Sequence, residues 1–125
     1  MAKRVLIIDD DPVVRSLLSE YLISRGHQVD VISRSDVAMA HLHNRDSVMP
    51  DLIMLDMIMP GLTGIELLKL LRADPSCSGV PIVMLSANSA SDTVAIFDHE
   101  TVSADSYLQK PFDFRALDQL INGLE

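Results

Sequence analysis

The sequence predicts an α/β domain built on a five-stranded parallel sheet with helices on both faces. Short apolar runs alternate five times with segments whose apolar residues recur at helical spacing, as in a parallel sheet. A length of 125 residues is enough for one large core without disulfides, and 48% hydrophobic residues is typical of a globular protein. No linker or repeat divides the sequence, so we expect residues 1–125 to form one domain.

The first strand and first helix follow from the N-terminal sequence. Residues 5–8 are apolar and lead into three consecutive acids, Asp9–Asp11. Pro12 suits the first turn of a helix that has Asp11 as its N-cap. Gly26 is expected to end this helix.

The second strand and second helix are predicted with a weaker pattern. Residues 28–33 alternate in polarity, as a half-exposed strand does. Ser35 or Asp36 is expected to cap a helix that runs to about His43. The more polar strand is expected at an edge of the sheet.

The middle of the chain supplies the most apolar strands. Residues 52–55 form a short apolar run that ends at Asp56, which predicts a strand buried on both faces. A leucine-rich helix is expected from Gly64 to about Arg72. Residues 81–85 are again wholly apolar and predict the fourth strand.

The C-terminal part completes the alternation. A weak helix is predicted over residues 92–100, and a short, more polar strand over residues 106–109. The last helix is expected to start near Asp113. Its apolar stripe consists of Leu117, Leu120, Ile121 and Leu124.

The polarity of the strands predicts their order. The first, third and fourth strands are uniformly apolar and should be central, whereas the second and fifth should lie at the edges. The doubly wound order 2-1-3-4-5 satisfies this with right-handed crossovers. It is the order of flavodoxin-like, three-layer α/β/α folds.

This strand order gathers polar residues at one end of the sheet. The chain reverses direction between the first and third strands, and such sheets bind ligands in the crevice beyond the carboxyl ends of those strands. Asp9 and Asp10 follow the first strand, and Asp56 ends the third. Ser86 follows the fourth strand and Lys110 the fifth. We expect these five residues to converge.

The chemistry of the converging residues favours phosphoryl transfer. Three clustered carboxylates repel, so either one of them stays protonated or a cation joins them. Oxygen ligands suit Mg²⁺, with Mn²⁺ as an alternative, because these ions share their coordination with water and phosphate oxygens. A carboxylate beside such a cation, a lysine and a hydroxyl is equipped to accept a phosphoryl group.

Composition limits the setting and the partners. A net charge of −8 argues against direct nucleic-acid binding, because phosphates need a basic face. The single cysteine, Cys77, cannot form an internal disulfide, which favours a reducing compartment. The sequence has no signal-peptide pattern and no apolar run of membrane-spanning length. We therefore expect a cytoplasmic protein that does not bind membranes.

Four motifs in order resemble the receiver domain of bacterial two-component response regulators. They are Asp9-Asp10, residues 56–64 (Asp-Met-Ile-Met-Pro-Gly-Leu-Thr-Gly), Ser86-Ala87 and residues 107–112 (Tyr-Leu-Gln-Lys-Pro-Phe). The resemblance covers essentially the whole chain, and the spacing of all four motifs together is specific. It implies a signalling switch that catalyses only its own phosphorylation and dephosphorylation.

The resemblance also implies roles for the residues of the crevice. Asp56 would be the phosphoacceptor, and its donor a phosphohistidine of a sensor histidine kinase or a histidine phosphotransfer protein. Asp10, Asp56 and the backbone carbonyl of Ile58 would ligate Mg²⁺, with Asp9 acting through water. The Lys110–Pro111 bond is typically cis in this family.

A second group of residues would bind the phosphoryl group and report its presence. Ser86 and Ala87 would contact it together with Lys110, and Tyr107 would rotate as Ser86 moves. That movement would change the surface formed by the fourth helix, fifth strand and fifth helix, for a downstream protein that the sequence does not identify. The predicted fourth helix lacks the basic residues of the family's dimers, so we expect a monomer or a weak dimer.

Two residues beside the phosphoryl group would tune its hydrolysis. Ile58 lies two residues after Asp56, and Asn88 two residues after Ser86. An isoleucine cannot orient an attacking water. We therefore predict slow self-dephosphorylation.

Three other functions agree less well with the sequence. A small phosphatase of the haloacid dehalogenase type would use Asp9 as nucleophile and Asp11 as general acid. However, no Gly-Asp-x-x-x-Asp follows Lys110, and Asp56 would have no role. A flavodoxin-like cofactor-binding protein would need a first loop rich in Ser, Thr and Gly rather than acids. An interaction module independent of phosphorylation would lack a key residue, and none is missing.

Overall fold

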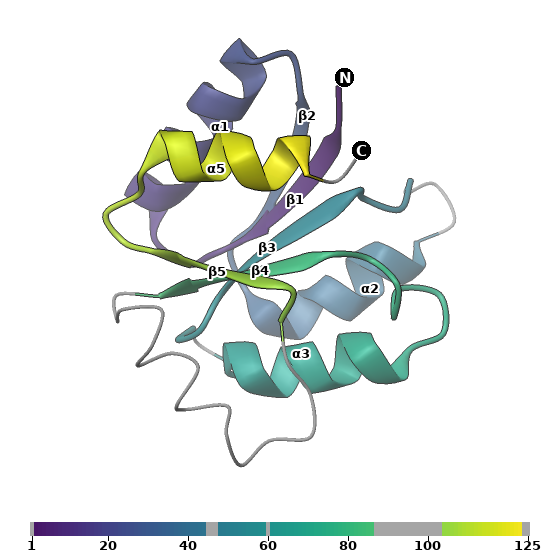
Figure 1. Ribbon diagram of the computed structural model, residues 1–125. Helices are drawn as coiled ribbons and strands as arrows, with labels where there is room; N and C mark the ends of the chain where they lie inside the picture. Colours follow the sequence, from purple (N-terminus) through teal and green to yellow (C-terminus); the bar gives the residue numbers. More distant parts are fainter. Residues whose placement is uncertain (1, 45–47, 60, 87–103, 124–125) are drawn as a thin grey trace.

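A computed structural model describes residues 2–44, 48–59, 61–86 and 104–123, and its central element is a parallel sheet between two helical layers (Figure 1). The strands are β1 (Arg4–Ile8), β2 (Gln28–Ile32), β3 (Leu52–Asp56), β4 (Ile82–Ser86) and β5 (Ser106–Gln109). The helices are α1 (Pro12–Ser24), α2 (Ala38–His43), α3 (Gly64–Ala73) and α5 (Phe114–Asn122). The helix predicted over residues 92–100 lies outside the described residues.

The strand order is β2-β1-β3-β4-β5, with every neighbouring pair parallel, which confirms the predicted fold class. The register sets the heights of the strand ends. Asp56 pairs with Leu85, so Ser86 extends one residue further than the end of β3. Ser86 pairs in turn with Gln109, which puts Lys110 one residue beyond that level. The carboxyl ends of the central strands therefore form one rim.

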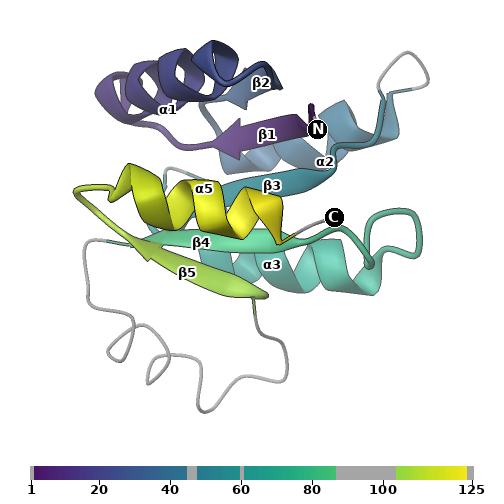
Figure 2. The same cartoon turned by 45° about the horizontal axis from the view of Figure 1, so that its top comes forward.

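Two hydrophobic cores lie on opposite faces of the sheet, because successive strand side chains point to opposite sides. Helices α1 and α5 cover one face, and α2 and α3 cover the other (Figures 1 and 2). The first core combines Val5, Ile7, Leu52, Met54, Val83 and Leu85 with apolar residues of α1 and α5. The second combines Leu6, Ile8, Ile53, Leu55, Ile82 and Met84 with those of α2 and α3.

The first and last helices begin as the sequence predicts. The Asp11 carboxylate accepts the Val13 N–H at 2.9 Å, and the Asp113 carboxylate accepts the Arg115 N–H at 2.9 Å. Leu117 and Ile121 are buried and Leu120 is half-buried, as expected for the stripe of α5. Leu124 lies outside the described residues.

The predicted cap of the second helix is wrong. A 3₁₀ turn over Ser35–Val37 precedes α2, and neither Ser35 nor Asp36 caps a helix with its side chain. The Ser35 hydroxyl instead donates to the Leu62 carbonyl at 2.5 Å, and Asp36 forms an ion pair with Arg34 at 2.7 Å. Asp36 accepts Arg34 on both carboxylate oxygens, and the Ser35 hydroxyl is directed to Leu62.

The start of α3 holds the loop after Asp56 in place. Thr63 and Glu66 form a capping box, a Thr-x-x-Glu signature that the sequence contains but from which no cap was predicted. The Gly64 N–H donates to the Met57 carbonyl at 2.8 Å. A Cβ at Gly64 would lie 2.3 Å from the carbonyl oxygen of Asp56, so only glycine permits this close approach.

Two further expectations concern single features. The Lys110–Pro111 bond is cis, as the resemblance implies. None of the described helices is long and apolar enough to cross a membrane.

Candidate functional site

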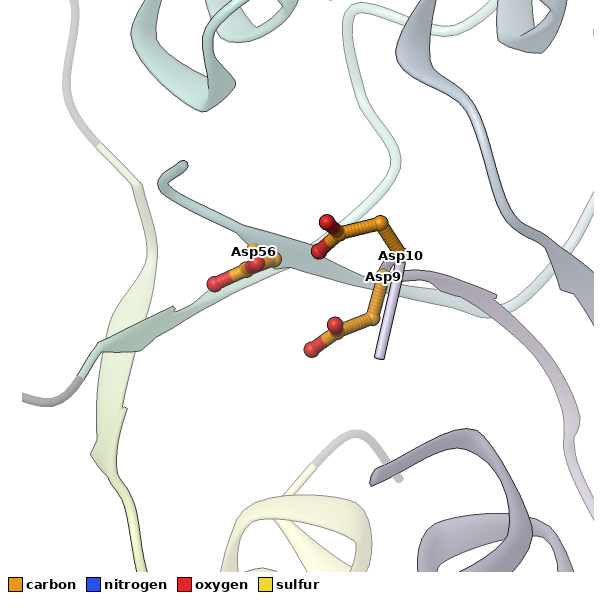
Figure 3. Close-up of side chains that lie close together, drawn as sticks. All are labelled: Asp9, Asp10 and Asp56. Atoms are coloured by element: carbon orange, nitrogen blue, oxygen red, sulfur yellow. The ribbon is translucent and has the colours of Figure 1, made fainter. Parts of the chain in front are cut away.

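Three aspartates meet at the carboxyl ends of β1 and β3. Asp9 and Asp10 directly follow β1, and Asp56 is the last residue of β3. One carboxylate oxygen from each lies within 4.8 Å of the others. Figure 3 shows the three carboxylates extending to the same side, away from the strands. The sequence-based prediction that these acids converge is confirmed.

The sheet fixes the backbone from which these side chains extend. The Asp9 N–H donates to the Ile32 carbonyl of β2 at 3.1 Å, and the Met57 N–H, just after Asp56, donates to Leu85 of β4 at 3.2 Å. On the other side of β4, the Lys110 N–H donates to the Ser86 carbonyl at 2.7 Å. Backbone pairing therefore continues one residue beyond the ends of β1, β3 and β5 and sets the spacing of the site.

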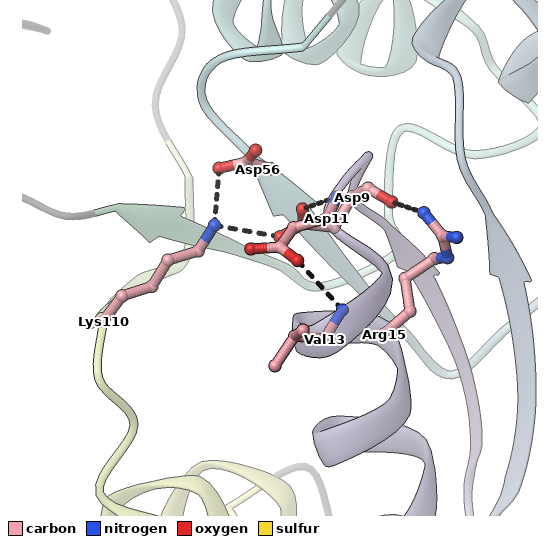
Figure 4. A network of polar contacts seen from close by, with 6 residues as sticks. All are labelled: Asp9, Asp11, Val13, Arg15, Asp56 and Lys110. Atoms are coloured by element: carbon pink, nitrogen blue, oxygen red, sulfur yellow. Dashed lines mark hydrogen bonds and ion pairs between the residues drawn. The ribbon is translucent and has the colours of Figure 1, made fainter.

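Lys110 bridges two of the acids (Figure 4). Its Nζ donates to Oδ2 of Asp9 at 3.0 Å and to Oδ1 of Asp56 at 3.2 Å. Its side chain is 23% exposed, whereas that of Asp9 is fully buried and that of Asp56 is 10% exposed. Removing one partner of an ion pair in such a buried setting is costly, because the other charge would stay buried without a partner.

The environment shifts the pKa of both partners. Burial, followed by the charge of Asp9, raises the pKa of Asp56 from 3.8 to about 6, although Lys110 acts in the opposite direction. Burial lowers the pKa of Lys110, but its hydrogen bond to Asp9 and the charge of Asp56 outweigh this, and the pKa is raised. Lys110 therefore stays cationic, and Asp56 is ionised at neutral pH.

The two consecutive aspartates are held differently. Asp9 accepts the Asp11 N–H on Oδ1 at 2.9 Å and Lys110 on Oδ2, and its backbone carbonyl accepts Arg15 Nη1 at 3.0 Å. Asp10 is exposed. Asp9 is therefore held in place by its hydrogen bonds, while Asp10 is open to solvent.

The donor set fits a hard divalent cation. Three carboxylates face one lysine, so the cluster carries an excess of two negative charges that a dication would balance. Carboxylate oxygens with open positions for water are the surroundings that Mg²⁺ prefers. Cys77, in contrast, is buried away from this cluster in the second core and offers no ligand to it.

The other predicted site residues differ in how deeply they are buried. Ser86 is buried at the end of β4, and Tyr107 is half-buried on β5 and packs against the core under α2 and α3. Ile58, two residues after Asp56, is 81% exposed. Ala87 and Asn88 lie outside the described residues, so their predicted roles remain predictions.

The geometry does not favour a phosphatase with Asp9 as nucleophile. Asp9 is fully buried, and each of its carboxylate oxygens accepts a hydrogen bond. Asp11, the general acid of that alternative, accepts the Val13 N–H as the cap of α1. These residues are engaged in holding the site rather than in contacting a substrate.

Comparison with known proteins gives one consistent result. The sequence model of the response regulator receiver domain family matches residues 5–122. The DNA-binding response regulator MtrA of Mycolicibacterium smegmatis is 39% identical over 112 residues, which are 90% of this chain and 46% of MtrA. The phosphate regulon transcriptional regulatory protein PhoB of Rhizobium meliloti is 36% identical, over 90% of this chain and 47% of PhoB. The chain thus spans about half the length of these relatives.

Solved structures agree with the sequence matches. The chemotaxis protein CheY4 of Vibrio cholerae superposes with a TM-score of 0.84 and 26% identity, and the alignment covers 100% of both chains. The response regulator TrrA of Thermotoga maritima, solved in complex with Mg²⁺ and BeF, has a TM-score of 0.79 and 30% identity, covering 98% of this chain and 99% of TrrA.

Proposed function

The chain belongs to the response regulator receiver domain family, and we propose that Asp56 is the residue whose phosphorylation operates it. Receiver domains of response regulators act in phosphorylation-dependent signalling rather than as enzymes with a turnover substrate. We extend this domain assignment from residues 5–122, which the family model matches, to all 125 residues.

The contacts of the three acids support Asp56 as the phosphoacceptor. Asp56 is the only one that both sits in a strand and shares Lys110 with a second carboxylate, among the described residues of the cluster. Asp9 is fully buried and hydrogen-bonded on both oxygens, whereas the Asp56 side chain is 10% exposed. A nucleophile must present an oxygen to the incoming phosphorus, which favours Asp56 over Asp9, and the bond from Lys110 favours Asp56 over the exposed Asp10.

The proposed reaction is a transfer from a phosphohistidine of a sensor histidine kinase or a histidine phosphotransfer protein. A carboxylate oxygen of Asp56 attacks phosphorus, an O–P bond forms, the N–P bond to the donor imidazole breaks, and the electron pair of that bond stays on its nitrogen. Lys110 lies beside the attacking carboxylate, where its ammonium can neutralise charge on the phosphoryl oxygens. The raised pKa of Asp56 keeps its carboxylate more basic than an exposed one.

We assign the cation site to Asp9, Asp10, Asp56 and the backbone carbonyl of Ile58. The carboxylate oxygens within 4.8 Å of one another support the first three. Asp10 and Asp56 would ligate directly, with Asp9 acting through water as its buried hydrogen bonds suggest. When bound, Mg²⁺ would neutralise the cluster and the transferring phosphoryl group, and Mn²⁺ could replace it.

The proposed switch uses residues at the ends of β4 and β5. Ser86 and Lys110 are joined through the backbone at the ends of β4 and β5. Tyr107 lies three residues before Lys110 and packs against the core, so a shift of Ser86 and Lys110 toward a phosphoryl group can be transmitted along β5. Ala87 would assist Ser86. The surface that changes would include β5 and α5, and its target is a downstream protein.

The expectations for setting and assembly remain proposals. We propose a cytoplasmic protein that acts as a monomer or weak dimer. Its net charge of −8 supports the expectation that these 125 residues do not bind nucleic acid directly. MtrA, about twice as long, is described as DNA-binding, so a mobility-shift assay with duplex DNA is needed to test this expectation.

Treatment with acetyl phosphate and Mg²⁺ tests the proposed function. Intact mass spectrometry should show one added phosphoryl group on the wild-type protein and none on Asp56→Asn. Omission of Mg²⁺ should suppress the gain. An equal mass gain in both proteins would contradict the assignment.

A further inference from the structure

One guanidinium holds the backbone where β1 leaves the sheet. Arg15, early in α1, donates from Nη1 to the carbonyl oxygen of Asp9 at 3.0 Å (Figure 4). We propose that Arg15 is a positioning residue for the cation site, because it fixes the peptide that joins Asp9 to Asp10 and so directs the Asp10 carboxylate toward Asp56. The inference rests on the proposed function, in which these acids hold Mg²⁺.

Hydrogen bonds hold the backbone of Asp9 in place on both sides. Its N–H donates to the Ile32 carbonyl at 3.1 Å, and its carbonyl accepts Arg15 at 3.0 Å. Its side chain is fixed separately by Lys110 and by the Asp11 N–H. Residue 9 is thus anchored on both sides of its Cα, and Arg15 supplies the anchor on the side that faces Asp10.

The planar peptide bond extends this restraint from Asp9 to Asp10. A carbonyl and the N–H and Cα that follow it lie in one plane, so fixing the Asp9 carbonyl also fixes where Asp10 begins. Asp10 is exposed, unlike Asp9 and Asp56, and packing does little to restrict it. Nevertheless its carboxylate lies within 4.8 Å of the other two. An exposed ligand held by its backbone loses less conformational freedom when it binds an ion.

The chemistry of the side chain explains why arginine suits this role. The guanidinium is planar, permanently charged and weakly hydrated, so it can donate to a carbonyl at the edge of an acidic cluster. Asp9 is fully buried, and its carbonyl would lose a partner if the guanidinium were removed. Residues that orient metal ligands without touching the metal often contribute strongly to metal affinity.

Titration calorimetry with MgCl₂ tests the proposal on the full chain. Arg15→Met, which keeps an unbranched aliphatic stem but no hydrogen-bond donor, should raise the dissociation constant for Mg²⁺ about tenfold. Arg15→Lys, which keeps the charge and one donor group, should show a smaller loss. Arg25→Met removes the same charge from the far end of α1, where Arg25 contacts Tyr21 and Asp118, and should bind Mg²⁺ like the wild type.

A second readout separates positioning from a general structural defect. The initial rate of phosphorylation by acetyl phosphate should require more Mg²⁺ for half-saturation in Arg15→Met, yet approach the wild-type rate when Mg²⁺ saturates. If Met is not accepted at this half-buried position, Arg15→Leu, which also lacks hydrogen-bond donors, provides the same comparison.

Two results would overturn the proposal in distinguishable ways. Wild-type affinity for Mg²⁺ in a folded Arg15→Met protein would reject the role of Arg15 and leave the proposed function intact. Equal weakening in Arg15→Met and Arg25→Met would show a charge effect rather than positioning. Failure of the wild-type protein itself to bind Mg²⁺ would instead reject the proposed cation site.

Discussion

The ammonium of Lys110 lies 3.2 Å from a carboxylate oxygen of Asp56, although 53 residues separate the two in sequence. The same ammonium reaches Asp9 at 3.0 Å. Lys110 approaches from beyond β5, an edge strand, whereas Asp9 directly follows the central strand β1 and Asp56 ends the central strand β3. It therefore joins the edge of the sheet to its centre, which is the connection that a phosphorylation signal would have to use.

Lys110→Met should destabilise the protein in EDTA at neutral pH. Loss of the ammonium leaves Asp9 and Asp56 without this counter-charge. The free energy of unfolding should fall by about 1–3 kcal/mol, a cost that is limited because Lys110 is only partly buried. Urea denaturation measures the free energy of unfolding. Arg115→Met, which removes a positive charge from an exposed position of α5, is a matched control that should change it little. A Lys110→Met protein as stable as the control would contradict the importance of this pair.

Asp56→Asn should make the metal-free protein more stable at about pH 7.5, by roughly 1–2 kcal/mol. Burial and the charge of Asp9 raise the folded-state pKa of Asp56 to about 6, above its unfolded value of 3.8. The folded state therefore binds this proton more tightly. The stability that protonation of Asp56 contributes is fully present below pH 3.8 and is lost as the pH rises through about 6.

The two proteins should consequently converge in stability as the pH falls from about 7.5 to about 4. Denaturation in EDTA across this range measures the difference. Addition of Mg²⁺ at the higher pH should also narrow the gap, because the ion stabilises the ionised carboxylates of the wild type. A difference that does not depend on pH would contradict the raised pKa.

Gly64→Ala should destabilise the protein by about 1–3 kcal/mol, because the new Cβ would lie 2.3 Å from the Asp56 carbonyl oxygen. Gly79→Ala is the matched control, since a Cβ there meets no atom within 4 Å. The displaced loop should also weaken Mg²⁺ binding, because the loop carries Ile58. Thermal unfolding and calorimetry measure the two effects. Equal stability of both alanine variants would contradict the close packing at Gly64.

Ile58→Asn should shorten the lifetime of the phosphorylated protein several-fold. Ile58 is 81% exposed, and its side chain is apolar, so that side chain cannot hydrogen-bond a water that attacks the acyl phosphate. An amide at this position can. Loss of the added mass over time, after removal of the phosphodonor, measures the half-life. A half-life that shortens in Ile58→Ala but not in Ile58→Asn would count against a role in orienting water.

The fold and the acid cluster could be predicted because both depend on the alternation of apolar strands and helices along the sequence. Apolar strands must be central, and the order that follows places Asp9, Asp10 and Asp56 at one rim. Parallel pairing then determines the spacing of the strand ends without knowledge of any side-chain contact. The positions of the acids could thus be inferred from strand boundaries alone.

Contacts between side chains and the backbone outside their own helix or turn could not be predicted in this way. A local rule made Ser35 a helix cap, but its hydroxyl bonds to Leu62, 27 residues away. Arg72 likewise bonds the carbonyls of Ser78 and Val80 and pairs with Asp105 at 2.6 Å, where the chain enters β5. The Arg15 bond to the Asp9 carbonyl is of the same kind. Such contacts depend on how elements pack, which residue spacing does not encode.

The central claim is that Asp56 carries the phosphoryl group, and chemical mapping of the modified residue tests it most directly. The protein is phosphorylated with acetyl phosphate and Mg²⁺, and borohydride then reduces the acyl phosphate, converting the modified aspartate to homoserine. Fragmentation of the resulting peptides locates the change. We expect homoserine at position 56 and unmodified Asp9, Asp10 and Asp11. Homoserine at position 9 or 10 while Asp56 stays intact would contradict the assignment.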